Sequence, residues 1–305
     1  MEIGHYPSGN GKDTITYYVY RPKAAPRAVV QICHGMCEYL RRYDHFAAFL
    51  NDRGILVCGN DHLGHGSSAA AREDYGYFGE KEGWKHLVGD AHRLTLRTKE
   101  AYPDVPYFLM GHSMGSFITR ACLSRYGNAF SGGILLGTSG TNRMAPLYYP
   151  GVRALARVRG GHYRSALISK LAFGTYNTRF KPHRTQFDWI SRDEDIVARY
   201  NEDRRCNFLF TLNGFLDLYY LLDSVSGRKW AERVPVDLPV LLMSGGMDPV
   251  GRRGRGVKEV HDHLALAGLK DLIMKLYPGC RHELLNEANR DRVYEDIYRW
   301  IEKRL

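Results

Sequence analysis

The short run Gly111-His112-Ser113-Met114-Gly115 constrains the fold of this chain more than any other feature. It follows an apolar run at residues 107–110, which predicts a buried strand, and precedes residues 116–123, whose spacing predicts a helix. A serine between two glycines at a strand-to-helix junction is typical of a nucleophile elbow, although the same pattern also occurs in ordinary turns. We predict that Ser113 is a nucleophile whose hydroxyl stands clear of the sheet, beside the unpaired N–H groups of the helix start.

Strand-like and helix-like segments alternate on both sides of this motif. Apolar or β-branched runs predict strands at residues 14–20, 28–33, 55–60, 107–110, 133–137, 239–243 and 271–277, and apolar spacing predicts helices at 43–53, 84–102, 116–123, 257–267 and 290–303. This alternation indicates an α/β protein with a mostly parallel central sheet and helices on both faces. Ligands bind at the carboxyl ends of the strands in such sheets, so we expect the site there.

Residues 138–229 interrupt this alternation. The segment has helical and loop-like stretches rich in Tyr, Phe, Leu and Arg, and it lacks a convincing central strand. We predict one core, made of residues 1–137 and 230–305, with residues 138–229 inserted as a helical cap over the strand ends. Its apolar residues are interleaved with Arg153, Arg157, Arg159 and Arg164. That pattern suits transient contact with a membrane or micelle surface, and it equally suits a cap packed on the loops below it.

Composition narrows the classes of partner. The formal net charge is +10, but the basic residues are scattered and no nucleic-acid-binding motif accompanies them, which argues against a nucleic-acid partner. A mild attraction to anionic lipid surfaces stays open. No apolar run reaches the ~18 residues of a membrane span, and the first residues lack the pattern of a signal peptide. Six cysteines in core-like surroundings are predicted to be free thiols, as in a cytoplasmic protein that is at most peripheral at membranes.

Metal binding is not indicated by the spacing of the usual ligands. Cys33 and Cys37 form a lone C-x₃-C pair, which is poor for zinc without a second such pair. His261 and His263 lie two residues apart in a predicted helix, a spacing that divides their rings between helix faces. We expect no metal site.

Two loops late in the chain supply partners for the serine. A serine hydroxyl needs a base to take its proton, and that base needs an orienting acid. Asp248 follows the strand-like run at 239–243, and His282 follows the run at 271–277. Asp248 precedes a proline and could be a simple turn residue, and most of the 13 histidines must be structural. The order Ser, Asp, His at successive strand ends favours a catalytic triad of Ser113, Asp248 and His282.

Acyl transfer also requires two hydrogen-bond donors for the tetrahedral oxyanion. We predict that one donor is the main-chain N–H of Met114, directly after the nucleophile. The other is expected from the loop His34-Gly35-Met36, after an earlier strand, as the main-chain N–H of Met36.

Together these residues resemble the α/β-hydrolase fold, and more closely its monoacylglycerol lipase and lysophospholipase branch, which is often grouped with serine aminopeptidases. The shared pieces are His34-Gly35-Met36-Cys37-Glu38, Arg42-Tyr43, the run Asp61 to Ser67, Gly111 to Gly115, Asp248 and His282. The resemblance implies hydrolysis of a lipid ester with one acyl chain, through an acyl-enzyme and without cofactor. It also implies that Glu38 and Arg42 line the polar end of the substrate pocket; the alternative is that this pair only braces its loop.

Three functions stay open at this point. The first is a serine hydrolase for monoacylglycerol, lysophospholipid or similar esters. The second is an aminopeptidase on the same triad, in which Glu38 is the one candidate we can name for holding a substrate's α-amino group. The third is a non-catalytic binding protein on a hydrolase scaffold, which is disfavoured because every triad position is filled. Ser116 stands where monoacylglycerol lipases often have glycine, so the substrate is less defined than the reaction.

Overall fold

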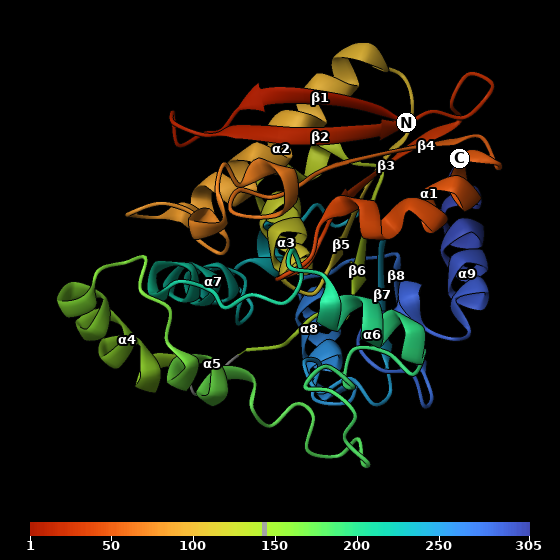
Figure 1. Ribbon diagram of the computed structural model, residues 1–305. Coiled ribbons are helices and arrows are strands. Elements are labelled where there is room, and N and C mark those ends of the chain that lie inside the picture. Colours follow the sequence, from red (N-terminus) through yellow and green to blue (C-terminus); the bar gives the residue numbers. More distant parts are fainter. Residues whose placement is uncertain (142–144) are drawn as a thin grey trace.

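The computed structural model describes residues 1–141 and 145–305 and shows one large sheet between two layers of helices (Figure 1). Within these residues the sheet has eight strands in the order β1-β2-β4-β3-β5-β6-β7-β8. Strand β2 is antiparallel to both of its neighbours, and the strands from β4 to β8 pair in parallel. The predicted mostly parallel α/β architecture is therefore confirmed.

The elements have the following bounds. The strands are β1 (Glu2–Pro7), β2 (Thr14–Tyr20), β3 (Ala28–Cys33), β4 (Ile55–Asn60), β5 (Tyr107–His112), β6 (Gly132–Leu136), β7 (Val240–Gly245) and β8 (Leu272–Tyr277). The helices are α1 (Asp44–Asn51), α2 (Gly83–Ala101), α3 (Met114–Tyr126), α4 (Ala145–Arg159), α5 (Ala166–Phe173), α6 (Glu194–Glu202), α7 (Leu212–Ser224), α8 (Arg255–Leu266) and α9 (Arg290–Glu302).

The two faces of the sheet are covered by different helices. Side chains alternate between faces along each strand, so neighbours such as Val29 and Val30 belong to separate apolar clusters. The cluster with Val29 includes residues of α2, α3 and α8, and the cluster with Val30 includes residues of α1 and α9. Because both faces are covered, every residue of β3, β4, β5 and β6 is buried, which explains their continuous apolar runs.

The structure adds one strand that the sequence pattern did not predict. Strand β1 pairs with β2 at the edge of the sheet, with Ile3 opposite Tyr18 and Tyr6 opposite Ile15. Only Tyr6 of its six residues is buried, so the strand carries no run of apolar residues that would reveal it. Main-chain pairing with β2, rather than burial, holds this edge.

The segment between β6 and β7 contains α4, α5, α6 and α7, and its described residues include no strand. Helix α7 contacts α2 and α3 of the core, whereas α4 and α5, drawn in green, extend away from the sheet (Figure 1). The placement of this segment between two core strands agrees with an inserted cap; its exact limits at residues 138 and 229 stay a prediction.

All six cysteines are free and buried, as expected for reduced thiols. The described helices include none that is both long and apolar enough to cross a membrane.

Candidate active site

Ser113 occupies a sharp turn between β5 and α3. Its backbone has φ 53° and ψ −121°, a conformation that L-residues rarely adopt and that typically costs about 1–3 kcal/mol. A methyl group on Gly115 would lie 2.0 Å from the carbonyl oxygen of Cys33, and one on Gly111 would lie 2.2 Å from the carbonyl oxygen of Gly115. Both flanking positions therefore exclude a side chain, as the predicted elbow requires. The main-chain N–H of Ser113 donates to the oxygen of Leu136, at 3.0 Å, which fixes the turn to the end of β6.

His282 and Asp248 form a buried pair in the loops that follow β8 and β7. His282 Nδ1 lies 2.9 Å from Asp248 Oδ2, and both side chains are buried. The carboxylate also accepts hydrogen bonds from the hydroxyl of Ser244 at 3.2 Å and from the N–H of Val250 at 2.8 Å. A carboxylate at Nδ1 keeps the proton of a neutral imidazole on that nitrogen and leaves Nε2 as the acceptor.

The imidazole and the elbow meet at the end of β6. A methyl group on Gly137 would lie 3.0 Å from Cε1 of His282, so the ring packs directly against that residue. The preceding residue, Leu136, accepts the hydrogen bond from Ser113. The ring centroid of His112, the residue before the serine, is 4.6 Å from that of His282. The structure thus brings Ser113, Asp248 and His282 to one edge of the sheet, and their catalytic roles stay predictions.

The loop after β3 lies beside the same serine. A methyl group on Gly35 would lie 3.1 Å from Cβ of Ser113. Neither the Met36 N–H nor the Met114 N–H donates a hydrogen bond to any other group in the described parts of the chain. Both predicted oxyanion donors are therefore free to bind a substrate oxygen.

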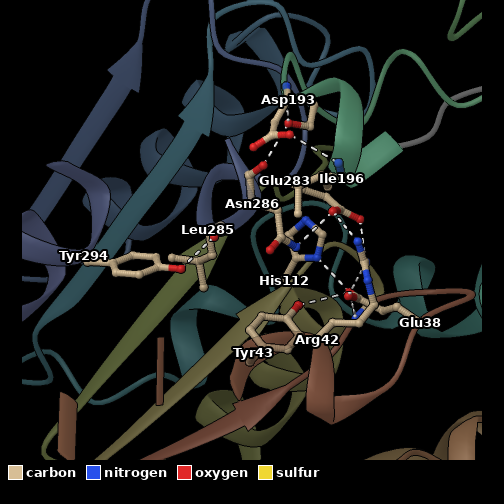
Figure 2. A network of polar contacts seen from close by, with 12 residues as sticks. Glu38, Arg42, Tyr43, His112, Asp193, Ile196, Glu283, Leu285, Asn286 and Tyr294 are labelled. Atoms are coloured by element: carbon tan, nitrogen blue, oxygen red, sulfur yellow. Dashed lines mark hydrogen bonds and ion pairs between the residues drawn. The ribbon is translucent and has the colours of Figure 1, made fainter. Parts of the chain in front are cut away.

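Glu38 is the centre of a buried polar network beneath this loop, shown in Figure 2. Its Oε1 accepts hydrogen bonds from the N–H of Gly35 and from the hydroxyl of Tyr43 at 3.0 Å, and lies 2.8 Å from His112 Nδ1. Its Oε2 accepts from Arg42 Nη1 at 3.0 Å. Burial alone would raise the pKa of this carboxyl, but His112 and then Arg42 hold the pKa well below its ordinary value. Burial alone would lower the pKa of His112, but the charge of Glu38 outweighs the effect of burial, so the pKa of His112 is raised.

Arg42 joins this network to the loop that carries His282. Its Nη1 and Nη2 donate to Oε1 and Oε2 of Glu283, each at 2.7 Å, in the two-pronged geometry that makes such pairs strong (Figure 2). Burial disfavours the cation, but the charge of Glu283 raises the pKa of Arg42 well above its ordinary value. The network therefore connects the loop after β3 to the residue that follows His282.

These contacts are those of a brace, because the groups of Glu38 and Arg42 are occupied by protein partners. Direct contact of either side chain with a substrate stays a prediction. Glu283 and His112 were not singled out from the sequence. The sequence offered one signal for Glu283, which is its position directly after His282 in a loop at the end of a strand. A carboxylate at that position can pair with a buried arginine from a neighbouring loop.

Cap residues form part of the wall around the imidazole. The ring of Trp189 lies 5.1 Å from that of His282, and its carbonyl oxygen accepts from the N–H of His282 at 3.4 Å. The ring of Tyr176 lies 5.1 Å from that of Trp189. The inserted segment therefore reaches the candidate catalytic residues directly.

Two groups of histidines lie outside this chemistry. His65 is buried and stacks on Phe78 at 5.6 Å, and burial, followed by repulsion from His34, lowers its pKa to about 3, so it is neutral and packs as a core residue. His261 and His263 belong to no cluster of three or more potential metal ligands in the part of the chain that the structure describes.

Comparisons with known proteins agree with this geometry. The family model described as "Serine aminopeptidase, S33" matches residues 24–289. A monoacylglycerol lipase of Mycolicibacterium smegmatis is 30% identical over 304 residues, which cover 97% of this chain and 96% of that protein. A human monoglyceride lipase is 24% identical over 315 residues, with 100% of this chain and 91% of that one covered.

Solved structures show the same arrangement of elements. A thermostable carboxyl esterase from Bacillus coagulans, in complex with glycerol, matches with a TM-score of 0.93 and 36% identity, over 99% of this chain and 98% of that one. A monoglyceride lipase from Saccharomyces cerevisiae, in complex with a substrate analogue, matches in fold with a TM-score of 0.78 and 20% identity, over 99% and 95% of the two chains. The protein is therefore an α/β-hydrolase, and the hydrolase class predicted from its motifs is confirmed. Within that class the chain belongs to the serine aminopeptidase family whose model it matches.

Proposed function

We propose that the protein is a serine hydrolase of carboxylic esters that carry one acyl chain, such as monoacylglycerols or lysophospholipids. The observation that carries this proposal is the buried His282–Asp248 pair, with Nδ1 and Oδ2 2.9 Å apart, at the strand ends that also hold the strained turn of Ser113. The relatives named above as lipases and esterases share most of the length of this chain, which supports an ester as the substrate.

We propose that these groups carry out the reaction as follows. The Ser113 hydroxyl attacks the ester carbonyl while His282 Nε2 takes its proton, and Asp248 stabilises the resulting imidazolium. The N–H groups of Met36 and Met114 bind the oxyanion of the tetrahedral intermediate. Collapse breaks the bond to the alcohol, which leaves with the proton from His282. A water molecule then repeats the sequence on the acyl-enzyme, releasing the fatty acid and restoring the serine.

A panel of esters tests this function. We expect turnover of monoacylglycerols or lysophospholipids by the wild-type protein and loss of turnover in Ser113→Ala. Ser124→Ala is the matched control, because Ser124 lies on the same helix, away from the turn. Labelling by a fluorophosphonate probe is expected in the wild type and the control but not in Ser113→Ala. A Ser113→Ala protein that keeps full esterase activity would contradict the proposal, and failure of the wild type to label would favour a binding protein instead.

An aminopeptidase is the second candidate, because the family model carries that description. It would need a carboxylate free to hold the α-amino group of a peptide. Both oxygens of Glu38 are already bonded, to Gly35, Tyr43, His112 and Arg42, which favours the esterase. Turnover of aminoacyl-naphthylamides above that of p-nitrophenyl esters would reverse this preference.

We also infer that helices α4 and α5 touch lipid surfaces during turnover. Four of their large apolar side chains are exposed, namely Leu147, Val158, Leu167 and Leu171. Arginines of α4 lie among them, which suits an anionic surface. Binding to phosphatidylglycerol vesicles that weakens with salt would support this contact. The six free thiols favour the cytoplasm as the location of the protein.

A further inference from the structure

Arg120 is a buried cation without an acidic partner. It lies on α3, two helical turns after Ser113, and its side chain is only 1% exposed. No carboxylate in the described parts of the chain forms an ion pair with it; Glu259 acts on it only from a distance. Burial lowers the pKa of its guanidinium to about 9, so the group is still charged at neutral pH. An unpaired buried arginine is rare, because such a charge is costly unless several other groups stabilise it.

The groups that do stabilise Arg120 come from the two ends of the inserted segment. Nη1 donates to the carbonyl oxygen of Ser139, at 2.8 Å, just after β6. Nη2 donates to the carbonyl oxygen of Val225, just after α7. The guanidinium also lies over the ring of Trp230, with 4.5 Å to the centroid. Both places where the chain leaves and re-enters the core are therefore bonded to one side chain of the nucleophile helix.

A chain of hydroxyl groups continues from this contact to the elbow. Arg120 Nη1 donates to the Thr138 hydroxyl oxygen at 3.3 Å, and the Thr138 and Ser116 hydroxyls lie 2.7 Å apart. The Ser116 hydroxyl donates to the carbonyl oxygen of Ser113 at 2.6 Å. The ends of the inserted segment, the helix and the nucleophile thus share one continuous set of hydrogen bonds.

We propose that Arg120 is a positioning residue that clamps both ends of the cap to the nucleophile helix and so sets how the cap lies over Ser113. The guanidinium carries its donors on separate nitrogens of a rigid planar fork, so it can bond main-chain carbonyls on two separate chain segments and a hydroxyl at once, whereas all three donors of a lysine lie on one nitrogen. The effect of this clamp on substrate preference rests on the proposed esterase function. Its effect on the two cap ends is independent of that function.

Amide hydrogen exchange tests the clamp directly. In Arg120→Met we expect exchange at residues 138–141 and 225–230 to rise about tenfold or more, because hydrogen bonds from a charged donor are lost there, while β5 is unchanged. Arg125→Met is the matched control, since Arg125 is an exposed arginine on the same helix that lies over Trp84 instead. Unchanged exchange at either end, or an equal rise throughout the core, would overturn the proposal.

Kinetics separate positioning from simple support of the elbow. We expect Arg120→Met to raise the KM for a long-chain monoacylglycerol several-fold and to leave kcat/KM for p-nitrophenyl acetate within about twofold, because only the long chain extends along the cap beyond the residues next to His282. An equal loss of kcat on both esters would overturn the proposal. If Arg120→Met does not fold, Arg120→Lys keeps the charge and should loosen at least one cap end. Exchange identical to the wild type at both ends in Arg120→Lys would also overturn it.

Discussion

The two halves of the inserted segment are attached to the core in different ways. Residues 187–206, which include α6, are joined to the loop around His282 by ion pairs and hydrogen bonds. Helices α4 and α5 are held mainly by aromatic and apolar contacts and expose several leucines and a valine. The difference indicates that one half has a fixed position beside the imidazole, while the other presents apolar surface to the surroundings.

The fixed half has partners in several core loops. Arg192 Nε donates to Glu287 at 2.9 Å, and the hydroxyl of Ser191 donates to the carbonyl oxygen of Asn286 at 2.8 Å. The ring of Tyr200, on α6, lies beneath the guanidinium of Arg42, with 4.8 Å to the centroid. This half is therefore continuous with the brace that joins Glu38, Arg42 and Glu283.

The other half rests on α7 through rings. Tyr149 of α4 stacks on Tyr220 with centroids 5.3 Å apart and meets Tyr219 edge-on at 5.1 Å. Val158 is 81% exposed and Leu167 is 66% exposed. Ring contacts tolerate small shifts better than ion pairs and directional hydrogen bonds do, so this half is the one suited to adapt to a lipid surface.

The largest expected effect is a loss of catalytic rate. Asp248→Asn should lower kcat about 10⁴-fold, because the amide orients the wrong imidazole tautomer. It should leave binding to phosphatidylglycerol vesicles unchanged, since that is assigned to α4 and α5. Steady-state kinetics and vesicle sedimentation measure the two effects. Equal loss of both would show that the vesicle contact is not separate from the site around His282.

Substitutions in the brace and on α4 should also differ in their effect on the free energy of unfolding. Arg42→Met removes the cation that pairs with the buried carboxylate of Glu283 and one of the two groups that stabilise Glu38, and it should lower the free energy of unfolding by about 3–5 kcal/mol. Arg153→Met on the exposed side of α4 should change it by less than about 0.5 kcal/mol. Urea unfolding of the two variants provides the comparison. A small effect of Arg42→Met would mean that the brace does not stabilise the fixed half.

The attachment of α7 should depend on pH. Asp217, on α7, accepts a hydrogen bond from the N–H of Trp84 at 3.1 Å, and burial raises the pKa of this carboxyl to about 7. A folded-state pKa above the unfolded value gives stability that is fully present below about pH 4 and is lost as the pH rises through about 7. The difference in unfolding free energy between wild type and Asp217→Asn should change over that window. A pH-independent difference would exclude titration of Asp217 there.

The smallest effect is expected at the exposed leucines. Leu167→Ser should leave the unfolding free energy within about 0.5 kcal/mol, because the side chain is already in water. The same change should weaken vesicle binding several-fold, since about one apolar side chain is lost from the contact. Leu147→Ser is a second test of the same surface. Unchanged vesicle binding in both variants would remove the proposed lipid contact.

Local constraints made much of this molecule predictable from sequence. The turn at Ser113 needs small residues on both sides, so the pattern around it reflects a requirement of the backbone itself. The buried strands β3 to β6 were evident because two covered faces demand continuous apolar runs.

Other parts depend on distant pairing that no local pattern carries. Strand β1 is exposed and is defined by its partner β2. Glu283 bonds to Arg42, far away in the chain, and Arg120 looks in sequence like any helical arginine, although its side chain holds two separate chain segments. Such roles follow from the folded arrangement of the loops and not from residue type or spacing.

The burial of the thiols has a consequence for how this enzyme responds to reactive compounds. Cys37 lies in the loop that carries the Met36 N–H, and Cys280 lies two residues before His282. Burial raises the pKa of both thiols, so neither is a thiolate near neutral pH. Both thiols should therefore react slowly with maleimides, with peroxide and with disulfides. The proposed nucleophile Ser113 is then the group open to covalent inhibitors, which acylate or phosphonylate an alcohol.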